Sequence, residues 1–297
     1  MARTQDKIIG FVILGFVAVM ALIVILTLVN LSMPGDVDFP AGGDKVAVIE
    51  LNGIITSSRS IVRQFKRYED DNSVKAIVFR IDSPGGGIAA SQEIYAKVRS
   101  VRDAGKPIVA SMGSVAASGG YYVALGADSI MAVPGTTTGS IGVIAEFPDF
   151  TQLLDKLGIE MNIIKSGRFK DTGTPYRDLT PRDREYLQEW INSGYEQFVA
   201  AVAEERQMDE DRVKELADGR VYSGQQAYEL ALIDTLGTFE DAIHLAARAG
   251  GIEGEPRIVR EERQKLTPFE LLFSFDVKAF VETYLSAWPR VQYKMFF

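Results

Sequence analysis

The segment VKAIVFRIDSPGGG, residues 74–87, decides the fold class of this chain. It begins with a short apolar run of the kind found in buried strands and ends in three consecutive glycines. The residues that follow have helical spacing between Ile94 and Val101, and Gly105 and Pro107 mark the end of that helix. A buried strand, a glycine-rich turn and a helix in this order are typical of an α/β domain.

Neighbouring segments extend the same alternation. VAVIELNGII (46–55) and PIVASMG (107–113) have the composition of strands, and SRSIVRQFKRYEDD (58–71) has helical spacing. A further helix is expected from Pro181, and an amphipathic one over 239–250. The helix from Pro181 carries an apolar stripe that we expect to face the core: Leu187, Trp190, Ile191, Tyr195, Phe198 and Val202.

Composition excludes several classes of function. The formal net charge of −8 argues against a nucleic-acid partner, because phosphate backbones require clustered Lys and Arg. The absence of cysteine excludes disulfides, thiolate catalysis and zinc sites built on thiols. His244 is the only histidine, and we expect it to be structural or exposed. We expect no cofactor and no metal.

An apolar run at the start of the chain predicts a membrane anchor. Residues 8–29 contain no charge and only one polar residue, which is enough apolar length to cross a bilayer core. We predict a transmembrane helix over 8–31; the alternative is a cleaved signal peptide, whose apolar region is usually shorter. Because Arg3 and Lys7 precede this helix, residues 1–7 are expected in the cytoplasm and the globular domain on the outer face.

Three further segments follow the predicted anchor. Residues 32–44 are rich in Pro, Gly and Asp, which indicates a linker, and we expect residues 45–250 to form the folded domain. The tail, 251–297, is apolar and aromatic. We expect it to dock on a neighbouring subunit or the membrane surface, or to lie in a substrate groove; the alternative is packing against its own domain.

Two glycine-rich turns are the candidate sites of chemistry. IDSPGGG (81–87) can present backbone N–H groups to an anion or oxyanion, although a tight turn without function is an equal alternative. In GSVAASGGYY (113–122), Ser118 precedes an apparent helix and Gly119 can offer an N–H to a developing oxyanion. Ser118 is then a candidate nucleophile. The alternatives are that it merely caps the helix, or that Ser114 is the reactive serine.

The general base of such a serine is expected to be a lysine, because the chain has a single histidine. Lys165 and Lys170, in IIKSGRFKDTGTP, both qualify by position, and spacing alone does not choose between them. The alternative is that each is a solvated surface lysine. Asp171 beside Lys170 would favour the charged ammonium and so counts against it unless the carboxylate points away.

Five ordered motifs, within residues 46–250, resemble those of the signal peptide peptidase A family of membrane-anchored serine proteases. They are IDSPGGG, MGSVAASGGYY, GTTTGSIGV, IKSGRFKD and DGRVYSGQQA. The resemblance implies a Clp-peptidase/crotonase-like fold and a Ser-Lys dyad, with Ser118 as nucleophile and Lys170 as general base. It also implies that the N–H groups of Gly86 and Gly119 are the oxyanion donors and that Ser140 helps to orient the lysine.

The resemblance also implies a substrate and an assembly. Substrates would be unstructured apolar peptides, such as signal peptides left in the membrane after secretion, and the domain would form a homo-oligomeric ring or dome with active sites built between subunits. Two other classes of function are weighed against this one: a catalytically inactive membrane scaffold or binding module of the same fold, and a coenzyme-A thioester enzyme.

Overall fold

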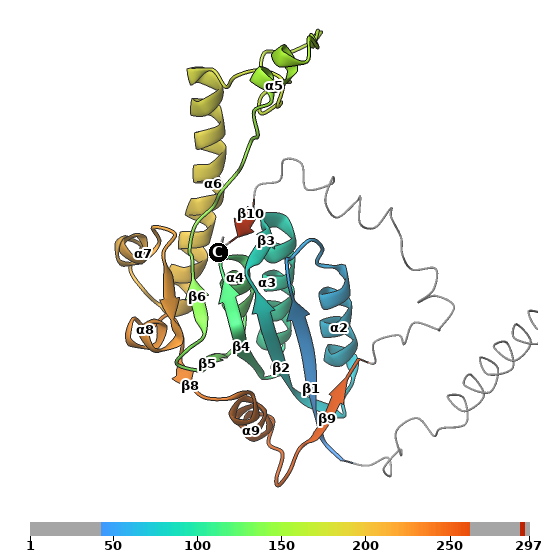
Figure 1. Ribbon diagram of the computed structural model, residues 1–297. Helices are drawn as coiled ribbons and strands as arrows, with labels where there is room; N and C mark the ends of the chain where they lie inside the picture. The colour runs from blue at the N-terminus through green and yellow to red at the C-terminus, as the bar shows by residue number, and fades with distance from the viewer. Residues whose placement is uncertain (1–42, 262–291, 295–297) are drawn as a thin grey trace, which may run out of the picture. The chain divides into compact units, whose positions relative to one another are not determined.

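The computed structural model describes residues 43–261 and 292–294, drawn in colour in Figure 1. All but Gly43 belong to one compact unit that starts at Asp44. The transmembrane helix predicted over residues 8–31 lies outside the described residues, as does most of the aromatic tail. Among the helices that are described, none has both the length and the apolar character needed to span a bilayer.

One mixed sheet of eight strands forms the centre of this unit, in agreement with the predicted α/β class. The order β7-β6-β4-β2-β1-β9 runs across it, and β5 pairs with β4 and with β8. All pairs are parallel except β6 with β7. The strands are β1 (Lys45–Asn52), β2 (Val74–Ser83), β4 (Ile108–Ala117), β5 (Ser129–Ala132), β6 (Thr137–Gly139), β7 (Val221–Ser223), β8 (Thr235–Leu236) and β9 (Arg257–Arg260).

Helices cover both faces of this sheet. Alternate residues of β1 face opposite ways: Ala47 and Ile49 belong to the larger apolar cluster, whereas Val46 and Val48 pack with Ala246 in a second cluster. The helices of the larger cluster are α2 (Arg59–Asp70), α3 (Ile88–Asp103), α4 (Gly119–Ala124), α6 (Pro181–Arg206), α7 (Glu210–Leu216) and α8 (Gly224–Glu229). α9 (Phe239–Ala249) covers the other face.

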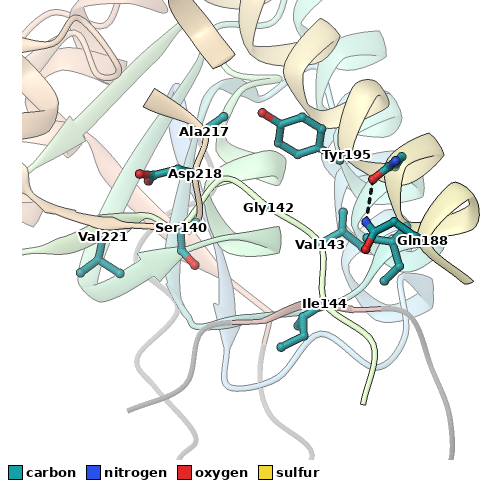
Figure 2. Close-up of a pocket in the computed structure, with 12 residues that line it drawn as sticks. Ser140, Gly142, Val143, Ile144, Gln188, Tyr195, Ala217, Asp218 and Val221 are labelled. Atoms are coloured by element: carbon teal, nitrogen blue, oxygen red, sulfur yellow. Dashed lines mark hydrogen bonds between the residues drawn. The ribbon is translucent and has the colours of Figure 1, made fainter. Parts of the chain in front are cut away.

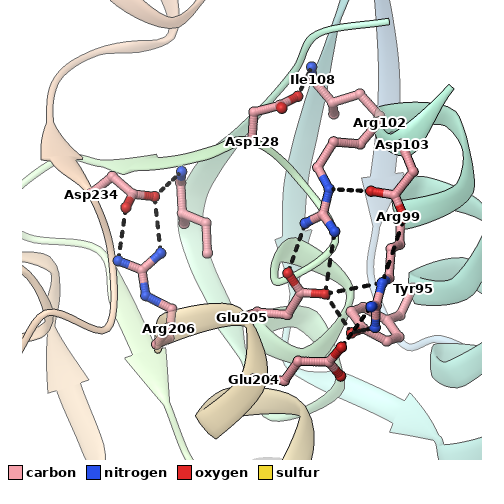
Figure 3. A network of polar contacts seen from close by, with 11 residues as sticks. Tyr95, Arg99, Arg102, Asp103, Ile108, Asp128, Glu204, Glu205, Arg206 and Asp234 are labelled. Carbon is pink, nitrogen blue, oxygen red and sulfur yellow. Dashed lines mark hydrogen bonds and ion pairs between the residues drawn. The ribbon is translucent and has the colours of Figure 1, made fainter. Parts of the chain in front are cut away.

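A polar network fastens the C-terminal end of α6 to α3 (Figure 3). Arg99 pairs with Glu204 at 2.6 Å, and Arg102 pairs with Glu205 at 2.7 Å. The Tyr95 hydroxyl donates to the same Glu205 carboxylate at 2.7 Å. Because Glu205 is nearly buried and has three partners, this end of α6 is held firmly against the domain.

Residues 144–180, which we call the arm, extend away from the sheet at the opposite end of α6 (Figure 1). They include α5 (Thr151–Lys156). Every residue from 155 to 170 is exposed. Large apolar side chains are exposed on the arm as well: Ile144, Phe150, Leu153, Leu157, Ile159, Met161, Ile163, Ile164, Phe169 and Tyr176.

The stripe predicted to face the core along α6 is therefore only partly correct. Phe198 and Val202 are fully buried, but Trp190 is 47% exposed. Leu187, one turn nearer to the arm, is buried, so in this half of α6 the stripe is covered at Leu187 and exposed at Trp190.

Candidate active site

Ser118 lies at a strained turn between strand β4 and helix α4. Its backbone has φ 52° and ψ −118°, a conformation that side-chain-bearing residues rarely adopt. Its N–H donates to Gly139 O at 2.8 Å, which fixes the turn against the end of β6. A serine on a sharp strand-to-helix turn is the arrangement in which hydrolases present a nucleophile.

The Ser118 hydroxyl is buried and unpaired. The residue is 1% exposed, and Oγ has no hydrogen-bond partner in the part of the chain that the structure describes. Although Ser118 occupies the N-cap position of α4, its side chain makes no capping hydrogen bond, so the helix-cap alternative is wrong. Ser114, the competing serine, is exposed on β4 four residues before the turn.

Two glycine segments meet beside this serine. The three glycines expected as a turn form a short strand instead, β3 (Gly85–Gly87), bridged to Ile55. A Cβ atom on Gly119 would lie 2.7 Å from Ser91 Oγ and 3.2 Å from both Gly85 Cα and Gly86 N. The structure therefore brings the two predicted donor residues, Gly86 and Gly119, next to each other and next to Ser118.

One backbone edge of Gly86 faces the C-terminal part of the chain. Ile55 N–H donates to Gly85 O at 2.9 Å, and Gly87 N–H donates to Ile55 O at 2.8 Å. Backbone polar groups alternate between the two edges of a strand, so those of Gly86 point to the opposite edge. There, β10 (Gln292–Lys294) pairs antiparallel with β3, and residue 293 lies opposite Gly86. This piece of the tail therefore packs against its own domain, beside the candidate site, and the docking predicted for the rest of the tail lies outside the described residues.

Ser140 lies one residue beyond the Gly139 carbonyl that holds Ser118. Its own backbone has φ 50°, and its N–H donates to Arg220 O at 2.8 Å. Ser140 lines a cavity of about 620 Å³ between the start of the arm and α6 (Figure 2). Val143, Tyr195 and Asp218 line the same cavity. It thus combines apolar side chains, neutral polar side chains and one carboxylate.

Neither candidate lysine contacts Ser118 within the chain. Lys165 and Lys170 both lie on the exposed arm, and the Lys165 ammonium pairs with Asp171 at 2.5 Å. Arg177 pairs with the same carboxylate at 2.9 Å, and the hydrogen bonds from Arg177 and Lys165 hold the pKa of Asp171 far below its usual range. Asp171 is thus directed to two other cations, which removes the argument against Lys170. A base role for Lys165 would require this ion pair to break.

His244 takes no part in the site. It lies on α9, which covers the face of the sheet opposite α4, and its Nε2 is 3.7 Å from Glu240 of the same helix. The expectation that it is structural or exposed is confirmed. Within one chain, this geometry excludes an imidazole-based triad at Ser118.

Ser83 and Ser91 are the contacts that sequence reasoning missed. Ser83 Oγ accepts a hydrogen bond from Gly85 N–H, and Ser91 Oγ donates to Gly87 O. The sequence signal for these contacts is spacing alone. Ser83 lies two residues before the first glycine of GGG, and Ser91 lies four residues after the last, which are distances at which a serine hydroxyl can bond the local backbone.

Comparisons with known proteins identify the family and support the fold. The model of Peptidase family S49 matches residues 100–253, and that of Clp protease matches residues 45–138, which supports a Clp-protease-like fold. A candidate protease of Synechocystis sp. is 45% identical over 70% of this chain and 76% of its own length. A candidate signal peptide peptidase SppA of Enterococcus faecium is 38% identical over 68% of this chain and 63% of its own length.

A third relative is much longer. Protease 4 of Haemophilus influenzae is 34% identical over 68% of this chain, and the match covers 34% of that protein. The match with the S49 model spans more than half of the chain, and the three relatives described above are named as proteases or peptidases. The chain therefore belongs to peptidase family S49, and it is a serine peptidase.

Proposed function

We propose that this protein is a membrane-anchored endopeptidase with a Ser-Lys dyad that is completed between two copies of the chain. Ser118 is the nucleophile, Lys170 is the general base, and the N–H groups of Gly86 and Gly119 bind the oxyanion. The observation that carries the proposal is the buried, unpaired Ser118 hydroxyl, held on a strained backbone beside two adjacent glycine segments. Buried hydroxyls without a partner are rare, and a reactive site is one reason for them.

The arm supports a base supplied by a neighbour. Lys170 is exposed among large apolar side chains that no other described residue covers, and exposed apolar surface of this kind marks an interface. The ring of Phe169 stacks on Tyr186 at 4.8 Å, which fixes the backbone next to Lys170. A projecting, ordered arm that carries the base is suited to reach the site of a second copy.

The cavity beside Ser140 is the place where we expect that lysine to arrive. Its apolar walls suit the methylene stem, while the Ser140 hydroxyl can accept a hydrogen bond from the amine. Removal of water on docking favours the neutral form of an amine, the form that a general base needs, and the Asp218 carboxylate, which would favour the ammonium, is already paired with Arg220. Ser140 thereby orients the base, as the resemblance implies.

Catalysis then follows as acyl transfer. Ser118 Oγ attacks the peptide carbonyl carbon while its proton passes to the Lys170 amine, and the oxyanion accepts hydrogen bonds from Gly86 and Gly119. The lysine returns the proton to the departing amine, which leaves an acyl-serine. Lys170 next takes a proton from water, and the resulting attack releases the carboxylic acid and restores Ser118.

Substrate and location complete the proposal. Extended apolar peptides, such as signal peptides left in the membrane, fit a site beside the strand edge that β10 occupies, because an extended peptide adds to such an edge by backbone hydrogen bonds and can replace β10 there. The transmembrane helix predicted over residues 8–31 would hold the domain on the outer face of the membrane, with residues 1–7 in the cytoplasm.

Mixing two inactive variants tests the shared site. We expect Ser118→Ala and Lys170→Ala to be inactive separately and active when they are co-assembled. If each site takes its serine and its lysine from different copies, random mixing in equal amounts restores about a quarter of wild-type activity. The measurement is peptide hydrolysis after the two full-length chains are dissociated and reassembled together. A mixture that stays inactive, although native electrophoresis shows mixed oligomers, would place both groups of the dyad in one copy.

The strand β10 is expected to compete with substrate for the edge of Gly86. A chain that ends at Arg290 lacks this strand, and we expect its apparent KM for a peptide to fall about 2–10-fold with kcat unchanged, since a tethered competitor acts at high effective concentration. Steady-state hydrolysis by the full-length and shortened chains measures the difference. A synthetic VQYKMFF peptide is the matched control, and it should inhibit the shortened chain competitively. An unchanged KM together with no inhibition would show that β10 and substrate use different edges.

A further inference from the structure

The strand β3 is held so that only the backbone groups of Gly86 point to the edge at which substrate is proposed to bind. Gly85 N–H donates to Ser83 Oγ at 3.1 Å, and Ser91 Oγ donates to Gly87 O at 3.0 Å. The remaining groups, Gly85 O and Gly87 N–H, are bound by the backbone of Ile55. The polar groups of both outer glycines are therefore bound by Ser83, Ser91 and Ile55, while those of Gly86 face the edge with which β10 pairs and from which a substrate would displace it.

Ser91 touches the second glycine segment as well. It is fully buried in the first turn of α3, and its Oγ lies 2.7 Å from where a Cβ on Gly119 would be. The same hydroxyl therefore fixes the peptide between Gly87 and Ile88, one residue beyond Gly86, and lies close to Gly119. Ser91 Oγ therefore lies close to both glycine segments.

Ser83 makes the equivalent contacts from the other side. It is fully buried at the end of β2, where its hydroxyl holds Gly85. Its carbonyl oxygen lies 2.5 Å from the Cβ position of Gly120, in the first turn of α4. Each serine thus contacts β3 through its hydroxyl and the start of α4 through a second contact.

We propose that Ser83 and Ser91 are positioning residues that set the distance and direction between the Gly86 and Gly119 N–H groups. The proposal rests on the proposed function, in which these groups bind the oxyanion. Such donors must lie about 2.7–3.1 Å from the oxygen as its charge develops, and small misplacements cost rate. Neither serine touches the substrate; both act through the glycines.

A structural role alone would give a different result from a positioning role. A serine in the first turn of a helix often donates a hydrogen bond to the carbonyl four residues back. Such a bond affects the stability of the fold but not the relative affinity of the site for substrate and transition state. A positioning role changes the affinity for a tetrahedral adduct and leaves the affinity for uncleaved peptide unchanged. The test therefore needs both affinities.

The experiment uses Ser91→Ala and Ser83→Ala in the full-length chain, with Thr136→Val as the matched control. Thr136 is also fully buried, and its hydroxyl donates to a backbone carbonyl, Gly113 O, at 2.8 Å, but it makes no contact with β3 among those described. Kinetics with an apolar peptide give kcat and KM. A leucine-rich tripeptide aldehyde, which forms a tetrahedral adduct with a serine, gives the second affinity.

We expect each serine variant to lower kcat about 10-fold with KM nearly unchanged, a part of the roughly 10²–10³-fold that one oxyanion donor contributes. Affinity for the aldehyde should fall by a similar factor, while peptide affinity measured in the Ser118→Ala background stays the same. Thr136→Val should lower the melting temperature without changing kcat or aldehyde affinity.

Several outcomes would overturn the inference. If the serine variants lose thermal stability but keep kcat and aldehyde affinity, the two serines have a structural role only. The same conclusion follows if both variants fail to fold. A wild-type protein that neither cleaves peptides nor binds the aldehyde contradicts the proposed function itself, and the positioning role falls with it. Activity that depends on Ser118 but not on Ser83 or Ser91 overturns the inference alone.

Discussion

Replacing Ser118 with alanine is expected to abolish peptide hydrolysis, with kcat lowered by about 10⁴-fold or more, as for other enzymes that lose their nucleophile. The fold should be unaffected, because the hydroxyl makes no hydrogen bond that the change would break. The substitution also leaves the backbone strain at residue 118 unchanged, because alanine has the same Cβ atom as serine. Hydrolysis of an apolar peptide and thermal unfolding of the full-length chain measure the two effects.

Ser114→Ala is the matched control for this change. Ser114 lies on the same strand and is exposed, so its replacement should leave kcat and the melting temperature as they are. Lys170→Ala should be as inactive as Ser118→Ala, whereas Lys165→Ala should retain activity because Lys165 is bound to Asp171. Full activity of Ser118→Ala, or of Lys170→Ala, would rule out the dyad as assigned.

The sheet was predictable from the sequence because its strands are buried on both faces. In β1, Ala47 and Ile49 pack under one layer of helices while Val46 and Val48 pack under α9, so the strand reads as a continuous apolar run. The glycine segments were also predictable as sites of chemistry, because GGG and SGG can bring backbone very close to its neighbours. The actual contact, with Gly119 beside Gly86, depends on the strand order, which no local pattern contains.

The arm was not predictable, and the reason is physical. Trp190 and the apolar residues of the arm have the same side chains as a core, and hydrophobic periodicity does not state which partner covers them. A surface that is completed by another molecule reads like a core in the sequence of one chain. The order of the motifs likewise indicated Lys170 as the base, but it contained no information that Lys170 lies on an exposed arm.

Gly86→Ala is expected to have the second largest effect. A Cβ atom at this position would lie 2.2 Å from Ile55 O and 2.6 Å from Ile55 N, both of them backbone atoms that no rotamer change can move. The strand β3 must therefore shift, and the Gly86 N–H moves with it. Loss of one oxyanion donor costs about 10²–10³-fold in kcat, and the overpacking itself costs about 1–3 kcal/mol of stability.

Gly87→Ala separates the donor from the glycine strand as a whole. The nearest atom to a Cβ on Gly87 is Ile55 O at 3.6 Å, an ordinary contact, and the backbone there has φ −60°. We expect this variant to keep kcat within about 3-fold of wild type, because neither the N–H of Gly86 nor its neighbours must move. Kinetics below the melting temperature of both variants make the comparison. If Gly86→Ala folds and keeps full kcat, the oxyanion must be bound by groups other than the Gly86 N–H, and the roles given to Ser83 and Ser91 would be wrong as well.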